Sequence, residues 1–309
     1  MRDDDVAGLD RRDPARPTFL GRRLAQPDEP VFDQGLTFDV STLLDRRRVL
    51  MGMGMAGIGA VLAACTPGAV TSSIGPSATA GPTTGVSLSA SPSPDVEGCA
   101  LIPGETAGPF PGDGSNGPDV LSKSGVIRSD IRSSFGTSTT AAPGVPLTIR
   151  FELVDLADGC VPYAGAAVYA WHCDRDGGYS MYSPGIEHEN YLRGVQAADD
   201  DGAVTFLSTF PGCYPGRWPH VHFEVYPTLD LASDASDAVA TSQLAFPADV
   251  CAAVYATPGY ESSLHNLAGV RLETDGVFGD DGGVRQLGSV RGSIDDGLTI
   301  TLTVPIDLA

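Results

Sequence analysis

The sequence predicts a mainly β domain, an antiparallel β-sandwich with few short helices, over residues 99–309. Segments of alternating apolar and polar residues recur along this part of the chain. Gly, Pro and Asp turns separate these segments, and no amphipathic pattern extends beyond about two helical turns. Short strands joined by such turns are typical of antiparallel sandwiches or barrels.

Each predicted strand has its own signal. The first and last predicted strands alternate with a period of two, the second is a short apolar run, and the third follows the turn signal Asp201-Gly202. Pro247–Tyr255 predicts a short helix, because proline suits its start and Val250 and Val254 lie one turn apart. The predicted strands are Leu147–Val154, Ala166–Trp171, Ala203–Leu207, His220–Tyr226 and Leu298–Val304.

Residues 1–64 have the layout of an export signal with a long, polar and disordered n-region. Paired arginines at Arg46-Arg47 precede an apolar run from Val49 to Ala64, which is shorter than the about 20 residues of a membrane span. Its many glycines disfavour the alternative, a packed core helix. The arginines resemble a twin-arginine signal, and Leu62-Ala63-Ala64-Cys65 resembles a lipobox. We therefore expect an exported, extracytoplasmic lipoprotein anchored to the membrane through Cys65.

Residues 65–98 consist largely of Ser, Thr, Pro, Gly and Ala, so we expect a flexible tether that buries too little apolar surface to fold. If Cys65 carries lipid, an oxidising compartment allows at most two disulfides and leaves one thiol over. The sequence leaves the pairing open. It contains no Cys-x-x-Cys pair, which disfavours a structural zinc site. The five cysteines that remain are Cys99, Cys160, Cys173, Cys213 and Cys251.

The charge of the chain excludes one class of partner. The formal net charge is -20 and the sequence pI is about 4.4. Such a surface repels the phosphate backbone of nucleic acids, so we expect no nucleic-acid partner. An acidic surface that keeps an exported protein soluble explains the charge without any further function.

The pair His220 and His222 lies in a predicted strand, where alternate side chains share a face. Two imidazoles on one face suit zinc, copper, iron or nickel, although a merely polar strand face explains the pair equally well. The preceding stretch, Phe210–Pro219, is too rich in Pro and Gly for a helix or a central strand. It is a loop that carries Tyr214 and Arg217, and a packed turn is its alternative explanation.

Upstream, Trp171–Ser180 predicts a strand, a turn and then an aromatic residue. Together with Asn190–Gly194 and the loop that leads into the histidine strand, it resembles the intradiol ring-cleavage dioxygenases, the family of protocatechuate 3,4-dioxygenase and catechol 1,2-dioxygenase. The resemblance covers most of residues 99–309 and is strongest over Pro162–Tyr226. Glu105–Phe110 is similar to the family's N-terminal segment near the substrate pocket.

The resemblance implies an iron enzyme with a sandwich of the intradiol type. Tyr179, Tyr214, His220 and His222 follow the family's ligand order and would bind one Fe(III), and Arg217 matches its active-site arginine. Two phenolates with two neutral imidazoles favour Fe(III) over Fe(II), and the metal must lower the phenol pKa from its usual value of about 10.

The implied partners are a catechol-type substrate and dioxygen. In the family's mechanism Tyr214 would leave the metal and help to take up a phenolic proton. Arg217 would stabilise developing negative charge, and oxygen would enter between the two hydroxyl-bearing carbons.

Two other functions are consistent with parts of the pattern. An extracytoplasmic β-sandwich can bind an aromatic or sugar ligand without catalysis, but such a module needs neither the full ligand set nor the arginine. Zinc-dependent hydrolysis at the two histidines lacks an acidic ligand. His172 points to the opposite strand face and is expected to be structural, while Tyr182 and Tyr191 are assigned to packing or the pocket wall. The specific catechol and the oligomeric state stay open.

Overall fold

The computed structural model describes residues 9–10, 18–19, 22–23 and 99–307. The predictions of a signal, a lipidated cysteine and a tether fall almost wholly outside these residues. In the N-terminal region the structure describes three two-residue strands that the sequence does not predict. They are β1 (Leu9–Asp10), β2 (Thr18–Phe19) and β3 (Arg22–Arg23), paired in that order.

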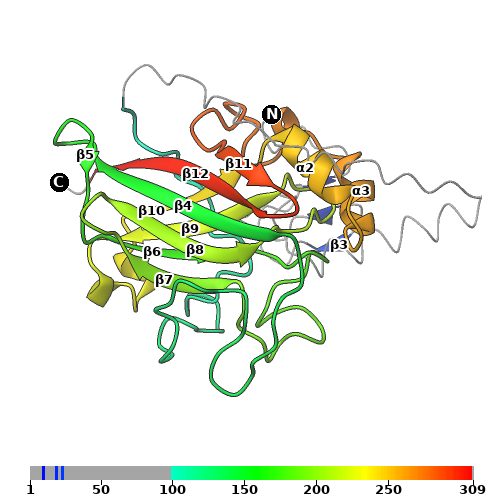
Figure 1. Cartoon of the computed structure of the whole chain (residues 1–309), viewed down its shortest axis with the longest axis horizontal. Helices are drawn as coiled ribbons and strands as arrows, with labels where there is room; N and C mark the ends of the chain where they lie inside the picture. The colour runs from blue at the N-terminus through cyan, green and yellow to red at the C-terminus, as the bar shows by residue number, and fades with distance from the viewer. Residues whose placement is uncertain (1–8, 11–17, 20–21, 24–98, 308–309) are drawn as a thin grey trace, which may run out of the picture.

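The domain consists of two sheets that lie one over the other (Figure 1), so the predicted mainly β sandwich is confirmed. The four-stranded sheet has the order β10-β9-β6-β7, and the five-stranded sheet has the order β11-β12-β4-β5, with β8 also paired to β4. The strands are β4 (Pro146–Asp155), β5 (Val161–Pro162), β6 (Ala167–Trp171), β7 (Arg193–Ala197), β8 (Ala203–Thr209), β9 (His220–Tyr226), β10 (Ala240–Ala245), β11 (Ser289–Ser293) and β12 (Gly297–Ile306).

All five predicted strands are present, and β9 has the predicted bounds. β5, β7, β10 and β11 were not predicted, because they are short or carry few apolar residues and therefore show no alternation. One pairing differs from the antiparallel expectation: β12 runs parallel to β4 along its length. β4 and β12, the first and last long strands of the domain, thus lie side by side. The other strands and the helices of the domain lie between them in the sequence.

The main hydrophobic core lies between the sheets, and it explains why β9 is buried along its whole length. Val221, Phe223 and Val225 point from β9 into this core. The alternate residues of β9 lie on the other face of the same sheet, which loops cover. Since a strand alternates its side chains, one strand supplies both core residues and residues for a site under the loops.

Two short helices lie at one end of the sandwich (Figure 1): α2 (Ala248–Tyr255) and α3 (Glu261–Leu267). The predicted helix is confirmed as α2, with Pro247 at its N-cap and one face buried. α3 was not predicted, because it is polar and buries only Ser263; it packs against α2. The domain also contains the 3₁₀ turns η3 (Leu229–Leu231), η4 (Ala235–Asp237) and η5 (Leu272–Thr274). Among the described residues no helix is both long and apolar enough to cross a bilayer.

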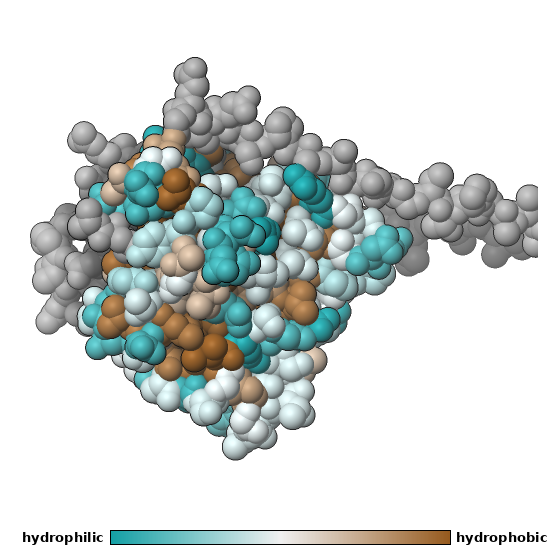
Figure 2. Space-filling view, turned by 60° about the vertical axis from the view of Figure 1, so that its left-hand side comes forward, coloured by the Kyte–Doolittle hydropathy of each residue, from teal (hydrophilic) through white to brown (hydrophobic). Residues whose placement is uncertain are grey.

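The face shown in Figure 2 is mostly of intermediate to hydrophilic character, and its apolar side chains form one larger patch and a few smaller ones. Such a surface agrees with the acidic composition of the chain. The exposed large apolar residues of the described part are Leu101, Ile127, Val161, Leu207, Leu231, Val239, Leu264 and Val284.

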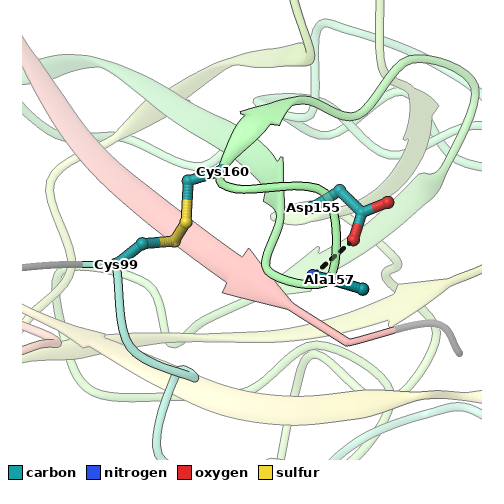
Figure 3. The surroundings of a disulfide bond; sticks show 4 residues. All are labelled: Cys99, Asp155, Ala157 and Cys160. Carbon is teal, nitrogen blue, oxygen red and sulfur yellow. Dashed lines mark hydrogen bonds between the residues drawn. A yellow bond between two sulfur atoms is a disulfide. The ribbon is translucent and has the colours of Figure 1, made fainter.

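A disulfide joins Cys99, where the domain begins, to Cys160, in the turn between β4 and β5 (Figure 3). The same turn is stabilised by Asp155, whose side chain accepts a hydrogen bond from the Ala157 amide at 2.9 Å. Cys173, Cys213 and Cys251 are reduced and buried, so one disulfide forms among the described residues. The disulfide holds Cys99, the first residue of the domain, next to the turn between β4 and β5 of the five-stranded sheet.

We predict that replacing Cys99 and Cys160 by alanine lowers the free energy of unfolding by roughly 2–4 kcal/mol, because the cross-link closes a loop with a sequence separation of 61 residues. Urea denaturation measures the loss. Reductant should lower the midpoint of the wild type by a similar amount and leave that of the double variant unchanged. A wild-type midpoint that does not respond to reductant contradicts the prediction.

Candidate metal centre

The candidate site is built on β9, at the centre of the four-stranded sheet. β9 is hydrogen-bonded on one side to β10 and on the other to β6, so its backbone cannot shift without breaking two ladders. His222 lies opposite Gln243 on β10 and opposite Trp171 on β6. His220 and His222 share the loop-covered face, as the sequence predicts for alternate residues of a strand.

The two imidazoles converge on one point. Nε2 of His220 lies 3.0 Å from Nε2 of His222 and 3.3 Å from the hydroxyl oxygen of Tyr214. The Trp171 ring stacks on His222 at a centroid distance of 5.0 Å and an interplanar angle of 5°, which fixes the orientation of that imidazole. Three of the four predicted ligands therefore present their donor atoms to each other.

Tyr214 reaches this point from the Pro- and Gly-rich loop between β8 and β9, which contacts with α3 hold in place. The Cys213 amide donates to the Ser263 hydroxyl at 2.9 Å, and the Asn266 side chain donates to the Cys213 carbonyl at 2.8 Å. The backbone of Cys213, the residue before Tyr214, is thus anchored at both its amide and its carbonyl. Its phenol ring lies edge-on to His220, with centroids 5.7 Å apart.

Tyr179 comes from the loop after β6, and its ring lies 6.1 Å from that of Tyr214 and 6.2 Å from that of His222. Asp174 shapes this loop by accepting a hydrogen bond from the Gly178 amide at 2.9 Å. At Gly177 the backbone has φ +85°, and a Cβ would lie 3.1 Å from Cβ of Tyr214. A glycine there lets the two tyrosine loops pass closely. All four predicted ligands therefore lie in one buried cluster.

The surroundings of both histidines favour the neutral imidazole. Nδ1 of His220 lies 2.5 Å from the Trp218 carbonyl oxygen. A carbonyl only accepts hydrogen bonds, so Nδ1 carries the proton and Nε2 presents a lone pair toward Tyr214 and His222. Burial, and next the Arg217 charge, hold the pKa of His220 far below its ordinary value; burial and the neighbouring His220 do the same for the pKa of His222.

Arg217 is buried, and the side chains of Asp275 and Gln243 fix its guanidinium. Its Nε donates to Oδ2 of Asp275 at 3.2 Å, and its Nη2 donates to Oε1 of Gln243 at 2.6 Å. Asp275 also accepts the amides of Trp218 at 2.6 Å and Val277 at 2.9 Å. Burial alone would raise the pKa of Asp275, but the guanidinium and the amide donors outweigh it and hold the pKa below its usual range.

Three residues of this arrangement were not singled out from the sequence as parts of a site: Trp171, Gln243 and Asp275. Gln243 could be recognised as a site residue only from its position opposite His222. That position is known only once the pairing of β10 with β9 is known. Asp275 is 58 positions from Arg217, and no local pattern relates them.

The other aromatic and histidine predictions agree with structural roles. His172 is bonded on both ring nitrogens, to the Cys173 carbonyl and the Ser208 hydroxyl, each at 2.7 Å. The Tyr191 hydroxyl donates to Asp174 at 3.2 Å, and the Tyr182 hydroxyl to Asn116 at 2.7 Å. Tyr191 therefore supports the turn that leads to Tyr179.

The donor set fits a metal ion that accepts phenolate oxygen and imidazole nitrogen. Within residues 99–307 and the six described positions before them, no group of three or more His, Cys, Asp and Glu side chains gathers as a metal site. Nδ1 of His222 is buried without a hydrogen-bond partner among the same residues, and its Nε2 faces another imidazole nitrogen. A cation between these donors would satisfy the facing lone pairs, and the two tyrosines of the same cluster offer oxygen donors beside it.

We predict that Asp275→Asn lowers the free energy of unfolding by about 3–5 kcal/mol at neutral pH, because Arg217 then stays buried without its counter-charge. The pKa of Asp275 is lower in the folded protein than in the unfolded chain. Its contribution to the free energy of unfolding is therefore fully present above about pH 4, and it is lost as the pH falls through the folded-state pKa. Chemical denaturation of both proteins over a pH series measures this.

Asp130→Asn is the matched control, since Asp130 pairs with Arg132 at the surface, with side chains 47% and 46% exposed. It should cost at most about 1 kcal/mol. Equal losses for the two variants would show that the buried ion pair has no special role in stability.

The sequence of the chain is similar to those of known dioxygenases. A family model described as Dioxygenase (Dioxygenase_C) matches residues 116–250, which include all four predicted ligands. Over 53 residues the chain is 38% identical to chlorocatechol 1,2-dioxygenase of Rhodococcus opacus, a stretch covering 17% of this chain and 21% of that relative. The match thus spans about a fifth of the curated protein.

Solved structures agree in fold. The intradiol ring-cleavage dioxygenase of Tetranychus urticae is 26% identical, with a TM-score of 0.53 over 68% of this chain and 95% of that chain. A second solved dioxygenase, covered to the same extent, is 25% identical with a TM-score of 0.54. These matches confirm the resemblance that the sequence predicts: the domain is similar in sequence and in fold to the intradiol ring-cleavage dioxygenases.

Proposed function

We propose that this protein is an Fe(III)-dependent intradiol dioxygenase, which cleaves catechol-type rings between the two hydroxyl-bearing carbons with dioxygen. The observation that carries the proposal is the convergence of His220, His222 and Tyr214 on one buried point, with Tyr179 in the same cluster and Arg217 beside it. The similarity to dioxygenases supports the reaction class.

Ferric iron suits these four side chains better than the divalent alternatives. Two phenolates carry a combined charge of minus two and are hard oxygen donors, which stabilises a trivalent ion, and the two imidazoles are neutral. Iron held by these residues would supply Lewis acidity toward the oxygens of a catechol and would make its ring reactive toward dioxygen. Zinc-dependent hydrolysis receives no support from this set, because no acidic side chain belongs to it.

The chain's own groups have distinct tasks in this reaction. Tyr214 is the more exposed residue of the two tyrosines, at 9% against 2% for Tyr179, and its hydroxyl lies 3.3 Å from Nε2 of His220, so we assign to Tyr214 the uptake of the proton of an incoming catechol. The guanidinium of Arg217 stabilises negative charge that develops on the substrate. Asp275 and Gln243 hold that guanidinium still, so little reorganisation is needed when the charge appears.

We also propose that the protein is exported and anchored through Cys65. The disulfide between Cys99 and Cys160 supports export, because structural disulfides persist in oxidising compartments and are rare in the cytosol. The three remaining described thiols are buried, where access by oxidants is poor.

The metal assignment predicts colour. The iron-loaded protein should absorb broadly in the visible from tyrosinate bound to Fe(III), and Tyr214→Phe should shift or weaken that band, because it removes one phenolate. Tyr163→Phe is the control, since Tyr163 lies half-buried against the core between the sheets. Metal analysis and visible spectra of the three proteins provide the measurement. A colourless protein that retains only zinc after exposure to both metals would contradict the assignment.

The reaction class predicts the product. Oxygen uptake with a panel of catechols should yield a muconic-acid-type dicarboxylic acid, identified by mass spectrometry. Arg217→Lys should lower kcat by roughly 10²–10³-fold, since a shorter, differently shaped donor no longer stabilises the developing charge. Circular dichroism establishes that the variant is folded. Cleavage beside the hydroxyl pair would refute intradiol chemistry, and tight catechol binding without turnover by iron-loaded protein would favour the binding module.

A further inference from the structure

The turn that carries Tyr179 is joined to the four-stranded sheet through the next residue, Ser180. Within the turn the Tyr179 amide donates to the Ser183 hydroxyl, and the Ser183 amide donates to the Tyr179 carbonyl, each at 2.9 Å. These bonds set the shape of the turn but not its distance from the histidine strand. The Ser180 hydroxyl donates to the Tyr191 carbonyl at 2.7 Å and accepts from Arg193 at 3.1 Å. Both contacts hold the turn beside the start of β7.

Arg193, the first residue of β7, binds this turn, the stretch before β4 and strand β6 together. Its Nε donates to the Ser180 hydroxyl, and its Nη2 donates to the Ser180 carbonyl at 3.0 Å. Nη2 also donates to the Phe110 carbonyl at 2.9 Å. Nη1 donates to the Pro111 carbonyl at 2.5 Å and to the Tyr169 hydroxyl at 3.1 Å. A guanidinium has five N–H groups, so each of them has one acceptor here.

The aromatic rings around this guanidinium pack on each other. The centroid of the Phe110 ring lies 5.2 Å from that of Tyr179 and 5.0 Å from that of Tyr182. The guanidinium carbon of Arg193 lies 5.4 Å from the centroid of the Tyr182 ring. Arg193 therefore holds the backbone of Ser180, which follows Tyr179 in the sequence, and the backbone of Phe110, whose ring packs on the Tyr179 phenol.

Backbone strain occurs on both sides of the contact between Ser180 and Arg193. Met181, which follows Ser180, has φ +72°, and Leu192, which precedes Arg193, has φ +57°. Residues other than glycine adopt this left-handed conformation rarely, and they keep it only where surrounding contacts enforce it. The packing is also close, since a Cβ at Gly112 would lie 2.7 Å from Nη1 of Arg193. The contact is thus maintained against local strain.

The shape of the Arg193 side chain explains its contacts better than its charge does. Its five acceptors are carbonyl and hydroxyl oxygens, and no carboxylate among the described residues forms an ion pair with it. Burial of a cation without a counter-charge is unfavourable. A planar guanidinium, however, can reach three chain segments at once, which the single nitrogen of a lysine cannot.

We propose that Arg193 is a positioning residue of the candidate metal centre, which keeps the Tyr179 phenol in place as a metal ligand by fixing the backbones of Ser180 and Phe110. The inference rests on the proposed function, since it concerns the same site. A residue that orients a metal ligand without binding the metal typically contributes about 10- to 100-fold to metal affinity.

The test is a double-variant cycle built on Arg193→Lys, which retains the charge and removes the planar fork. Competition with a chelator gives the dissociation constant of the metal, and the visible spectrum of the iron-loaded protein gives the tyrosinate band. Arg193→Lys alone should weaken metal binding by about 10- to 100-fold and shift the band. In a Tyr179→Phe background, which already lacks this phenol, Arg193→Lys should cause no further loss of affinity and no shift of the remaining band.

Leu153→Ala is the control for lowered stability. Leu153 is a buried core residue of β4, in the other sheet, so its truncation destabilises the fold without changing the contacts of Arg193. It should leave the metal affinity and the band unchanged. Ser180→Ala is a milder second variant, which removes the hydroxyl that accepts from Nε of Arg193. It should change affinity and band in the same direction as Arg193→Lys, by a smaller amount, and thus provides the test if Arg193→Lys does not fold.

An equal loss of affinity with and without the Tyr179 phenol overturns the inference, and so does an equal loss in Leu153→Ala. Coupling between Arg193 and Tyr179 without oxygen uptake on any catechol would support the role of Arg193 and reject the proposed catalysis. The affinity cycle can be run with whichever metal the protein retains, so a zinc protein would refute the proposed function while the role of Arg193 is still decided.

Discussion

The buried carboxylate of Asp275 is the contact on which the geometry of the site depends. It accepts the guanidinium of Arg217 and the amide of Trp218, the two residues that immediately precede Pro219 and β9. The Trp218 carbonyl in turn orients His220 through Nδ1. One carboxylate therefore sets the position of a cationic group and, through the backbone of Trp218, the direction in which an imidazole lone pair points.

Strand β9 contributes residues both to the hydrophobic core and to the candidate metal centre. Val221, Phe223 and Val225 pack into the core between the sheets, and His220 and His222, on the other face of the strand, form part of the candidate metal centre. Because Trp171 stacks on His222 from the neighbouring strand β6, the imidazole is restrained by a residue that is itself fully buried. Changes in the core that move β9 would thus move both histidines together.

The stretch from Cys99 to Pro111 lies against the candidate site, although its residues come before β4, the first strand of the sandwich. The disulfide at Cys99 fixes its beginning, Gln243 holds Thr106, and Arg193 binds the carbonyls of Phe110 and Pro111. These contacts come from both sheets and from opposite ends of the segment. The backbone of this stretch is therefore held at several points next to the candidate site.

The sequence by itself determined the mainly β class, the strands β4, β6, β8, β9 and β12, helix α2 and the common face of His220 and His222, because these follow from local periodicity. The order of tyrosines and histidines predicted that four side chains meet, through resemblance. Only the tertiary structure decided that Asp275 pairs with Arg217, that Gln243 lies opposite His222, that β4 and β12 run parallel and that Cys99 bonds Cys160. These contacts join residues separated by 21 to more than 100 positions along the chain, and no local pattern records such partners.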